Sequence, residues 1–130
     1  LRAVDGVEDV LIALQKKDIK ICVASSGSFE KMNLTLGLTG LKHYFKGNIF
    51  NSSQVKRGKP YPDLFLFAAD QMQVEPAKSL LIEDSVPGVQ GGVAAGMEVM
   101  AYSSRGNSEA LKKAGGLVIS DMRQILDHIS

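Results

Sequence analysis

Two adjacent carboxylates follow a short apolar run in the second half of the chain. Residues 80–82 are apolar, Glu83 and Asp84 come directly after them, and a glycine-rich stretch begins at Pro87. In an open α/β sheet, residues at the carboxyl end of a strand lie in the crevice where ligands bind. Neighbouring carboxylates repel each other, and a hard cation such as Mg²⁺ relieves that repulsion. The pair is therefore predicted to bind a metal ion, although Asp84 or Ser85 also fits the cap of the helix that follows.

A second candidate site is the turn Ser25-Ser26-Gly27, which follows the apolar residues 21–24. Hydroxyl groups and free backbone amides gather there at the start of a predicted helix, whose dipole favours a negative charge. An oxyanion could be held at this turn. Serines at such a junction are also common helix caps, and the local sequence alone favours that simpler interpretation.

A lysine lies on a loop that two prolines stiffen. Lys59 is followed by Pro60 and, one residue later, by Pro62. Since proline fixes a backbone dihedral angle, this segment has reduced freedom. An ammonium group on a stiff loop suits a phosphate oxygen or a developing negative charge. The alternative is a solvated surface lysine, which is the usual state of this residue type.

The chain alternates between helical and strand patterns almost from end to end, which is typical of an α/β layered domain with a parallel sheet. Strands are predicted at residues 21–24, 48–50, 80–82, 99–102 and 117–119. Pro62 and Pro87 are placed to open helices, and Gly96 to close one. No repeat or long linker divides the sequence, so we expect one domain over residues 1–130.

Glycines are frequent in the helix that begins at Pro87. Gly91 and Gly92 lie in its interior, where each costs about 1 kcal/mol relative to alanine, so close packing of this helix against the sheet is predicted. The spacing of the glycines from Gly88 to Gly96 does not fit G-x-G-x-x-G, which argues against dinucleotide binding.

Composition excludes several classes of protein. The chain has 15 basic and 14 acidic side chains and a net charge of +1, so we expect no nucleic-acid partner. Its single cysteine, Cys22, lies in an apolar run and is interpreted as a small hydrophobic residue rather than a nucleophile. No apolar stretch is long enough to cross a membrane, and no leader pattern opens the sequence. We therefore expect a cytoplasmic protein with no membrane partner.

In their order along the chain, the three candidate sites resemble motifs of the haloacid dehalogenase superfamily, specifically its β-phosphoglucomutase-like phosphatases. The resemblance runs from about Val4 to Tyr102. Residues 24–26 are similar to the second motif and residues 58–63 to the third. Residues 82–85, together with Gly88 and residues 95–97, are similar to the fourth. It implies a Rossmann-like core with three α/β/α layers around a parallel sheet.

The resemblance also implies a role for each candidate residue. Ser25 and the amide of Ser26 would hold a phosphoryl group. Lys59 would neutralise the negative charge of both the phosphoryl group and the nucleophile. Glu83 and Asp84 would bind Mg²⁺. The implied reaction is hydrolysis of a phosphomonoester of the sugar-phosphate type through an aspartyl-phosphate, with transfer back to a sugar as the mutase variant. The partner would be a small phosphorylated metabolite.

One part of the family pattern does not occur in this chain. The family's nucleophile and general acid/base are the two aspartates of an Asp-x-Asp motif at the end of the first strand, and the sequence contains no Asp-x-Asp. By resemblance, that strand is the central one, between the strands at Ile21 and Leu80, and the helical cap that selects the substrate would also lie upstream. We therefore expect the 130 residues to be the carboxyl-terminal part of the core domain of a larger enzyme, inactive by themselves.

Two further expectations follow from the same gap in the pattern. An upstream segment or a partner chain would have to complete the sheet, because unpaired strand edges in a buried slot are costly. The alternative to an enzyme is a non-catalytic remnant of the fold that binds phosphate or a partner. An upstream Asp-x-Asp after an apolar strand would favour the enzyme.

Overall fold

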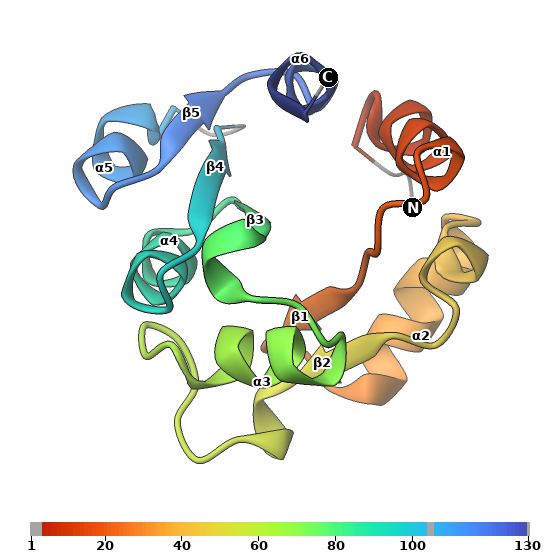
Figure 1. Ribbon diagram of the computed structural model, residues 1–130, viewed down its shortest axis with the longest axis horizontal. Coiled ribbons are helices and arrows are strands. Elements are labelled where there is room, and N and C mark those ends of the chain that lie inside the picture. The colour runs from red at the N-terminus through yellow and green to blue at the C-terminus, as the bar shows by residue number, and fades with distance from the viewer. Residues whose placement is uncertain (1–3, 104–105, 130) are drawn as a thin grey trace.

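The computed structural model describes residues 4–103 and 106–129 (Figure 1). Helices and strands alternate along these residues, as the sequence predicted. The helices are α1 (Val7–Lys16), α2 (Phe29–Leu38), α3 (Asp63–Gln71), α4 (Val86–Ala94), α5 (Ser108–Lys113) and α6 (Gln124–Ile129). The strands are β1 (Val23–Ser25), β2 (Ile49–Asn51), β3 (Leu80–Glu83), β4 (Glu98–Tyr102) and β5 (Leu117–Ile119). Three short 3₁₀ helices are η1 (Lys42–Phe45), η2 (Ser52–Gln54) and η3 (Pro76–Lys78).

The strands form two parallel sheets. β1 pairs with β2, and β4 lies between β3 and β5 in the second sheet. Every strand pair among the described residues is parallel, which requires the helical crossovers seen between them. The predicted α/β class with a parallel arrangement is therefore confirmed.

Helices cover both faces of the three-stranded sheet. On one face, Met100 of β4 packs with Val10 of α1 and Ile125 of α6. On the other face, Ala101 of β4 packs with Leu111 of α5 and with a residue of α4. Successive side chains of a strand point to opposite faces, so β4 contributes to both apolar clusters. This part of the molecule has the three α/β/α layers that the resemblance implied.

The first strand begins later than predicted. A strand was expected over residues 21–24, but β1 starts at Val23, whose N–H donates to the carbonyl of Asn48 at 3.0 Å. Before Asn48 the backbone has positive φ angles, 51° at Lys46 and 80° at Gly47, so the chain turns away there and cannot extend the ladder. The strand expected over residues 48–50 is likewise shifted by one and ends at Asn51.

The glycine-rich helix packs more closely than a helix with side chains at these positions could. A Cβ at Gly92 would lie 2.5 Å from a carbon of Leu81 and 2.7 Å from one of Val99, both in the sheet. The prediction of close helix–sheet packing is thus correct for Gly92. It is wrong for Gly91, where a Cβ would instead lie 2.9 Å from the ring of Phe65 in α3. Gly96, with φ of +81°, closes the helix as predicted.

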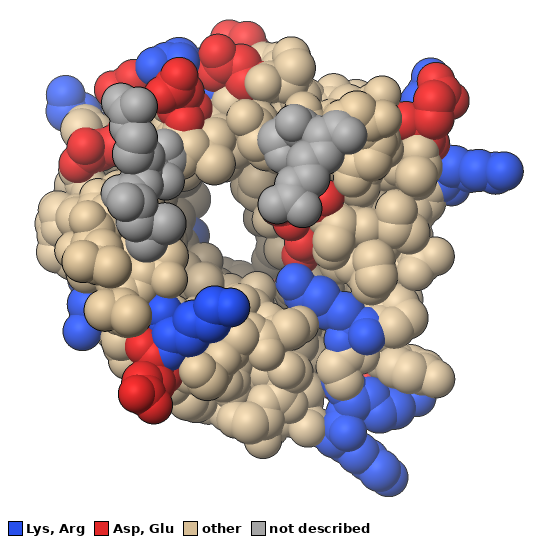
Figure 2. All heavy atoms as spheres, turned by 180° about the vertical axis from the view of Figure 1, so that it is seen from behind, with Lys and Arg blue, Asp and Glu red and all other residues tan. Residues whose placement is uncertain are grey.

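Within residues 4–103 and 106–129, the two sheets are not joined by backbone hydrogen bonds. Among the described residues, the edge of β1 opposite β2 and the edge of β3 opposite β4 have no strand partner. α3 contacts β1, β2 and α4, and thereby links the two halves. Figure 2 shows an opening through the middle of the molecule, and in Figure 1 β3 and the segment leading into β1 lie on either side of it. The expected empty position between these strands is present.

Cys22 lies just before β1 and is only partly buried. Burial raises the pKa of its thiol, so the reactive thiolate is disfavoured. This agrees with its interpretation as a small hydrophobic residue. Separately, no helix within residues 4–103 and 106–129 is long and apolar enough to cross a membrane.

Candidate functional site

The carboxyl end of β3 carries a buried ion pair. The Nζ atom of Lys59 lies 2.8 Å from Oε2 of Glu83, and the exposed fractions of the two side chains are 14% and 8%. The other carboxylate oxygen, Oε1, accepts hydrogen bonds from the N–H of Asp84 and the hydroxyl of Ser85, each at 3.1 Å. A buried charge is costly unless it is paired and hydrogen-bonded, and these contacts satisfy both oxygens of the Glu83 carboxylate.

The amino end of α4 fits closely around the same carboxylate. Ser85 caps the helix, since its Oγ accepts a hydrogen bond from the N–H of Gly88 at 3.2 Å. A Cβ at Gly88 would overlap the carboxyl group of Glu83. Glycine therefore lets the helix end, whose dipole favours a negative charge, come within contact of Glu83. Of the two caps that the sequence allowed, Ser85 is the one observed and Asp84 is not.

Asp84 differs from its neighbour in being exposed. The two predicted metal ligands are thus adjacent but unlike, because Glu83 is already bonded to Lys59 while Asp84 faces solvent. No group of three or more histidine, cysteine, aspartate or glutamate residues that could hold a metal ion occurs in the described part of the chain. Mg²⁺ is commonly bound through only one or two protein carboxylates, with water and substrate phosphates completing its shell, so the donor set fits this ion.

The serine turn after β1 has an internal hydrogen bond. The Oγ of Ser25 accepts from the N–H of Gly27 at 3.1 Å, and Ser26 is exposed. The helix cap is a different serine, Ser28, whose Oγ accepts from the N–H of Lys31 at 3.1 Å. The simpler interpretation of Ser25 and Ser26 as caps is therefore wrong, and both lie at the carboxyl end of a strand.

Asn51, a residue that the sequence analysis missed, connects this turn to the end of β2. Asn51 ends β2 and is aligned with Ser25 of β1. Its Nδ2 donates to the carbonyl of Gly27 at 3.0 Å. The available signal was a polar residue directly after a short apolar strand, the same signal that identified Glu83.

A second ion pair lies at the lysine loop, which is the loop over residues 56–62 that carries Lys59. Arg57 donates from Nη2 to Oδ1 of Asp63 at 3.0 Å and from Nε to Oδ2 at 3.3 Å. Its guanidinium carbon also lies 4.3 Å from the ring centroid of Tyr61. The hydrogen bond from Arg57 lowers the pKa of Asp63. This pair joins the two ends of the segment that contains Lys59.

We expect the Arg57–Asp63 pair to stabilise the fold in a pH-dependent way. The pKa of Asp63 is lowered from its ordinary value of 3.8, so its contribution is present above that value and is lost as the pH falls through the folded-state pKa. In the complete protein, Asp63→Asn should lower the Tm at about pH 7 and change it less at about pH 3.

Glu75→Gln is the matched control, because the Lys78–Glu75 pair is almost fully exposed and its two side chains are only three residues apart. This change should shift the Tm less than Asp63→Asn does at neutral pH. Equal shifts for Asp63→Asn at both pH values, measured by thermal unfolding, would contradict the prediction.

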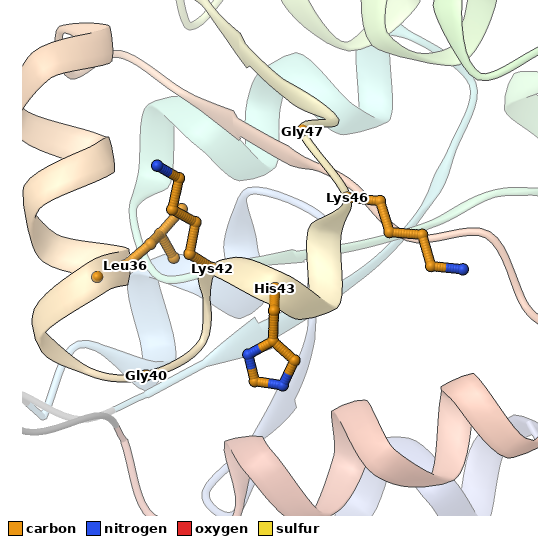
Figure 3. Close-up of a pocket in the computed structure, with 7 residues that line it drawn as sticks. Leu36, Gly40, Lys42, His43, Lys46 and Gly47 are labelled. Carbon is orange, nitrogen blue, oxygen red and sulfur yellow. The ribbon is translucent and has the colours of Figure 1, made fainter.

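A surface hollow elsewhere does not form a converging site. It has a volume of about 460 Å³ and is lined by residues of α2, η1 and the adjoining turns. Figure 3 shows that the side chains of Lys42, His43 and Lys46 point in different directions there. Because these side chains do not converge on one point, the ion pair at the end of β3 remains the stronger candidate site.

A parallel α/β fold with charged groups at the carboxyl end of a strand is a common plan of ligand-binding and catalytic α/β proteins. The sequence model of the haloacid dehalogenase-like hydrolases matches residues 1–96. This chain therefore belongs to the haloacid dehalogenase-like hydrolases, as the three motifs indicated.

Relatives of known activity include sugar phosphatases. The chain is 36% identical over 102 residues to 6-phosphogluconate phosphatase of Escherichia coli K12, covering 78% of this chain and 45% of that protein. It is 32% identical over 124 residues to a phosphorylated carbohydrates phosphatase of Thermotoga maritima, covering 94% of this chain and 57% of the other. The chain thus spans about half the length of these relatives.

The fold is also that of solved members of the family. A β-phosphoglucomutase from Clostridium difficile superposes with a TM-score of 0.81 at 30% identity, covering 97% of this chain and 54% of that one. The similarity to β-phosphoglucomutase-like proteins is thereby confirmed over nearly the whole chain.

Proposed function

We propose that this chain forms the phosphate- and metal-binding part of a phosphomonoester hydrolase that acts on sugar phosphates, either a phosphatase or a phosphoglucomutase-like enzyme. The observation that carries the proposal is the buried Lys59–Glu83 pair beside the exposed Asp84. An ammonium group with little exposure thus contacts the last residue of β3, and an exposed carboxylate follows directly in the chain. The sugar phosphatases among its relatives support the same reaction class.

The lysine and serine residues would bind the phosphoryl group. An ammonium group has three donors, and one of those of Lys59 goes to Glu83, so two remain for phosphate oxygens. Charge that develops on those oxygens is best stabilised by fixed donors in a site with little water. The Ser25 hydroxyl and the Ser26 amide would supply further donors from the end of β1.

Glu83 and Asp84 are the residues that would hold Mg²⁺. Asp84 would be the direct ligand, since the Glu83 carboxylate is engaged by Lys59, the Asp84 N–H and Ser85. When bound, the ion supplies charge neutralisation for the phosphoryl oxygens. Glu83 would add a second carboxylate to the metal site, and it hydrogen-bonds Lys59.

Asp84→Asn in the complete protein should raise the Kd for Mg²⁺ by at least about tenfold, since even residues that only contact metal ligands have effects of that size. Asp70→Asn is the matched control, because Asp70 is an exposed aspartate on α3. Isothermal titration calorimetry with Mg²⁺ measures both variants. Unchanged affinity in Asp84→Asn would remove Asp84 from the metal site.

The family resemblance implies an aspartyl-phosphate intermediate, whose nucleophile would come from outside these 130 residues. We propose that an extended segment carrying it pairs with the free edges of β1 and β3 and is supplied by an upstream part of the protein or by a partner chain. Both edges present unpaired backbone groups, which favour the addition of a strand. Residues 1–130 alone would then be inactive.

A further inference from the structure

The described part of the chain has two buried polar or charged residues, Asn51 and Glu83. Glu83 belongs to the ion pair at the end of β3. Asn51, whose exposed fraction is 5%, is the last residue of β2 and is aligned with Ser25 of β1. Since burial of an amide is costly unless it is fully hydrogen-bonded, the partners of Asn51 indicate what it does.

The side chain of Asn51 bonds to two different loops. Its Nδ2 donates to the carbonyl of Gly27 at 3.0 Å, in the turn that follows β1. Its Oδ1 accepts from the N–H of Ser53 at 3.1 Å and from the hydroxyl of Ser53 at 2.6 Å, in η2. The backbone N–H of Asn51 donates to Oε1 of Gln54 at 3.0 Å. Donor and acceptor of one amide are thus divided between the turn after β1 and η2, the 3₁₀ helix that Asn51 caps.

Each loop carries one half of the proposed phosphate site. The turn after β1 holds Ser25 and Ser26, and η2 leads into the loop with Lys59. That loop lies against η2, because a Cβ at Gly58 would be 3.5 Å from the Cβ of Ser52. Asn51 therefore hydrogen-bonds the serine turn to η2, and η2 in turn lies against the loop with Lys59 at Gly58.

We propose that Asn51 is a positioning residue that sets the place of the Ser25–Gly27 turn relative to the Lys59 loop, so that both contact the same phosphoryl group. The inference deepens the proposed function and rests on it. Groups that bind one small anion must be held within roughly half an ångström of their productive positions. A displacement of about 1 Å is enough to reduce such binding or catalysis strongly.

The test compares three variants of the complete protein. Asn51→Ala removes both connections, whereas Asn51→Ser keeps a side-chain oxygen that can cap η2 and loses the amide that reaches Gly27. Neither change adds a charge near the proposed phosphate site, and Asn51→Ser retains a cap for η2 if Asn51→Ala does not fold. Ser53→Ala is the control, since it removes one bond to Oδ1 and leaves the bond to Gly27 intact.

The measured quantity is the Kd for inorganic phosphate in the folded state, by calorimetry well below the Tm of each variant. We expect both Asn51 variants to raise this Kd by about tenfold or more, with Mg²⁺ affinity unchanged and Ser53→Ala close to wild type. A merely structural residue would lower the Tm without changing the Kd. Wild-type affinity in both Asn51 variants would overturn this inference alone, whereas failure of the wild-type protein to bind phosphate would overturn the proposed function with it.

Discussion

Lys59→Ala in the complete protein should lower kcat/KM for phosphomonoesters by about 10²-fold or more, the usual loss when one fixed donor to a developing oxyanion is removed. It should also destabilise the fold, because it leaves the Glu83 carboxylate buried without its cation. Removing one partner of a buried pair costs about 3–5 kcal/mol. The side chains are 14% and 8% exposed, so we expect a value near the lower end of that range.

The effects of this substitution on activity and on stability can be separated with a double variant. In the double variant Lys59→Met with Glu83→Gln, no charge remains buried, so the free energy of unfolding should recover while activity stays low. Lys56→Ala, at an exposed lysine of the same loop, is the control for the loss of a positive charge nearby. Activity within about tenfold of wild type in Lys59→Ala, where one fixed donor is worth at least 10²-fold, would show that Lys59 does not act on the substrate.

Gly88→Ala should be destabilising and should reduce activity, although alanine is favoured over glycine in helices. The new Cβ would overlap the carboxyl group of Glu83, so either the helix must move away from β3 or the carboxylate must leave Lys59. Overpacking of this kind costs about 1–3 kcal/mol. Displacement of Glu83 would also release Lys59 from the position proposed for phosphate binding.

Gly37→Ala is the matched control for Gly88→Ala. Gly37 lies in α2, and a Cβ there would meet nothing within 4 Å, so the same chemical change should be neutral or stabilising by up to about 1 kcal/mol. Chemical denaturation of the two variants gives both values. The close fit between α4 and Glu83 would be contradicted if the free energy of unfolding changed in the same direction in both variants. Normal activity in Gly88→Ala would also contradict it.

The fold could be predicted from local patterns because its elements are short and well marked. Pro62, Ser85 and Gly96 all lie at helix ends, where the sequence suggested them. The start of β1 was predicted too early because the positive φ angles at Lys46 and Gly47, which limit the ladder, have no signature in the strand itself. Pairing partners, and not the apolar run alone, decide where a parallel strand begins.

The site could be predicted only in part. Each candidate residue was recognised by its own motif, but the ion pair joins Lys59 and Glu83 across 24 positions and depends on the packing of the lysine loop against α4. At Asn51 the local pattern, with Gln54 three residues later, indicates only the cap of η2, whereas the contact with Gly27 arises only when β1 and β2 are aligned. Contacts between residues of separate elements could not be predicted from the local sequence.

The most direct test of the proposed phosphatase activity is the release of inorganic phosphate from a panel of sugar phosphomonoesters by the complete protein, with and without Mg²⁺. Our account predicts turnover that requires Mg²⁺ and that falls in Lys59→Ala and Asp84→Asn but not in Lys56→Ala. Phosphate binding without turnover of any substrate in the panel would contradict it and would identify the chain as part of a non-catalytic phosphate-binding protein.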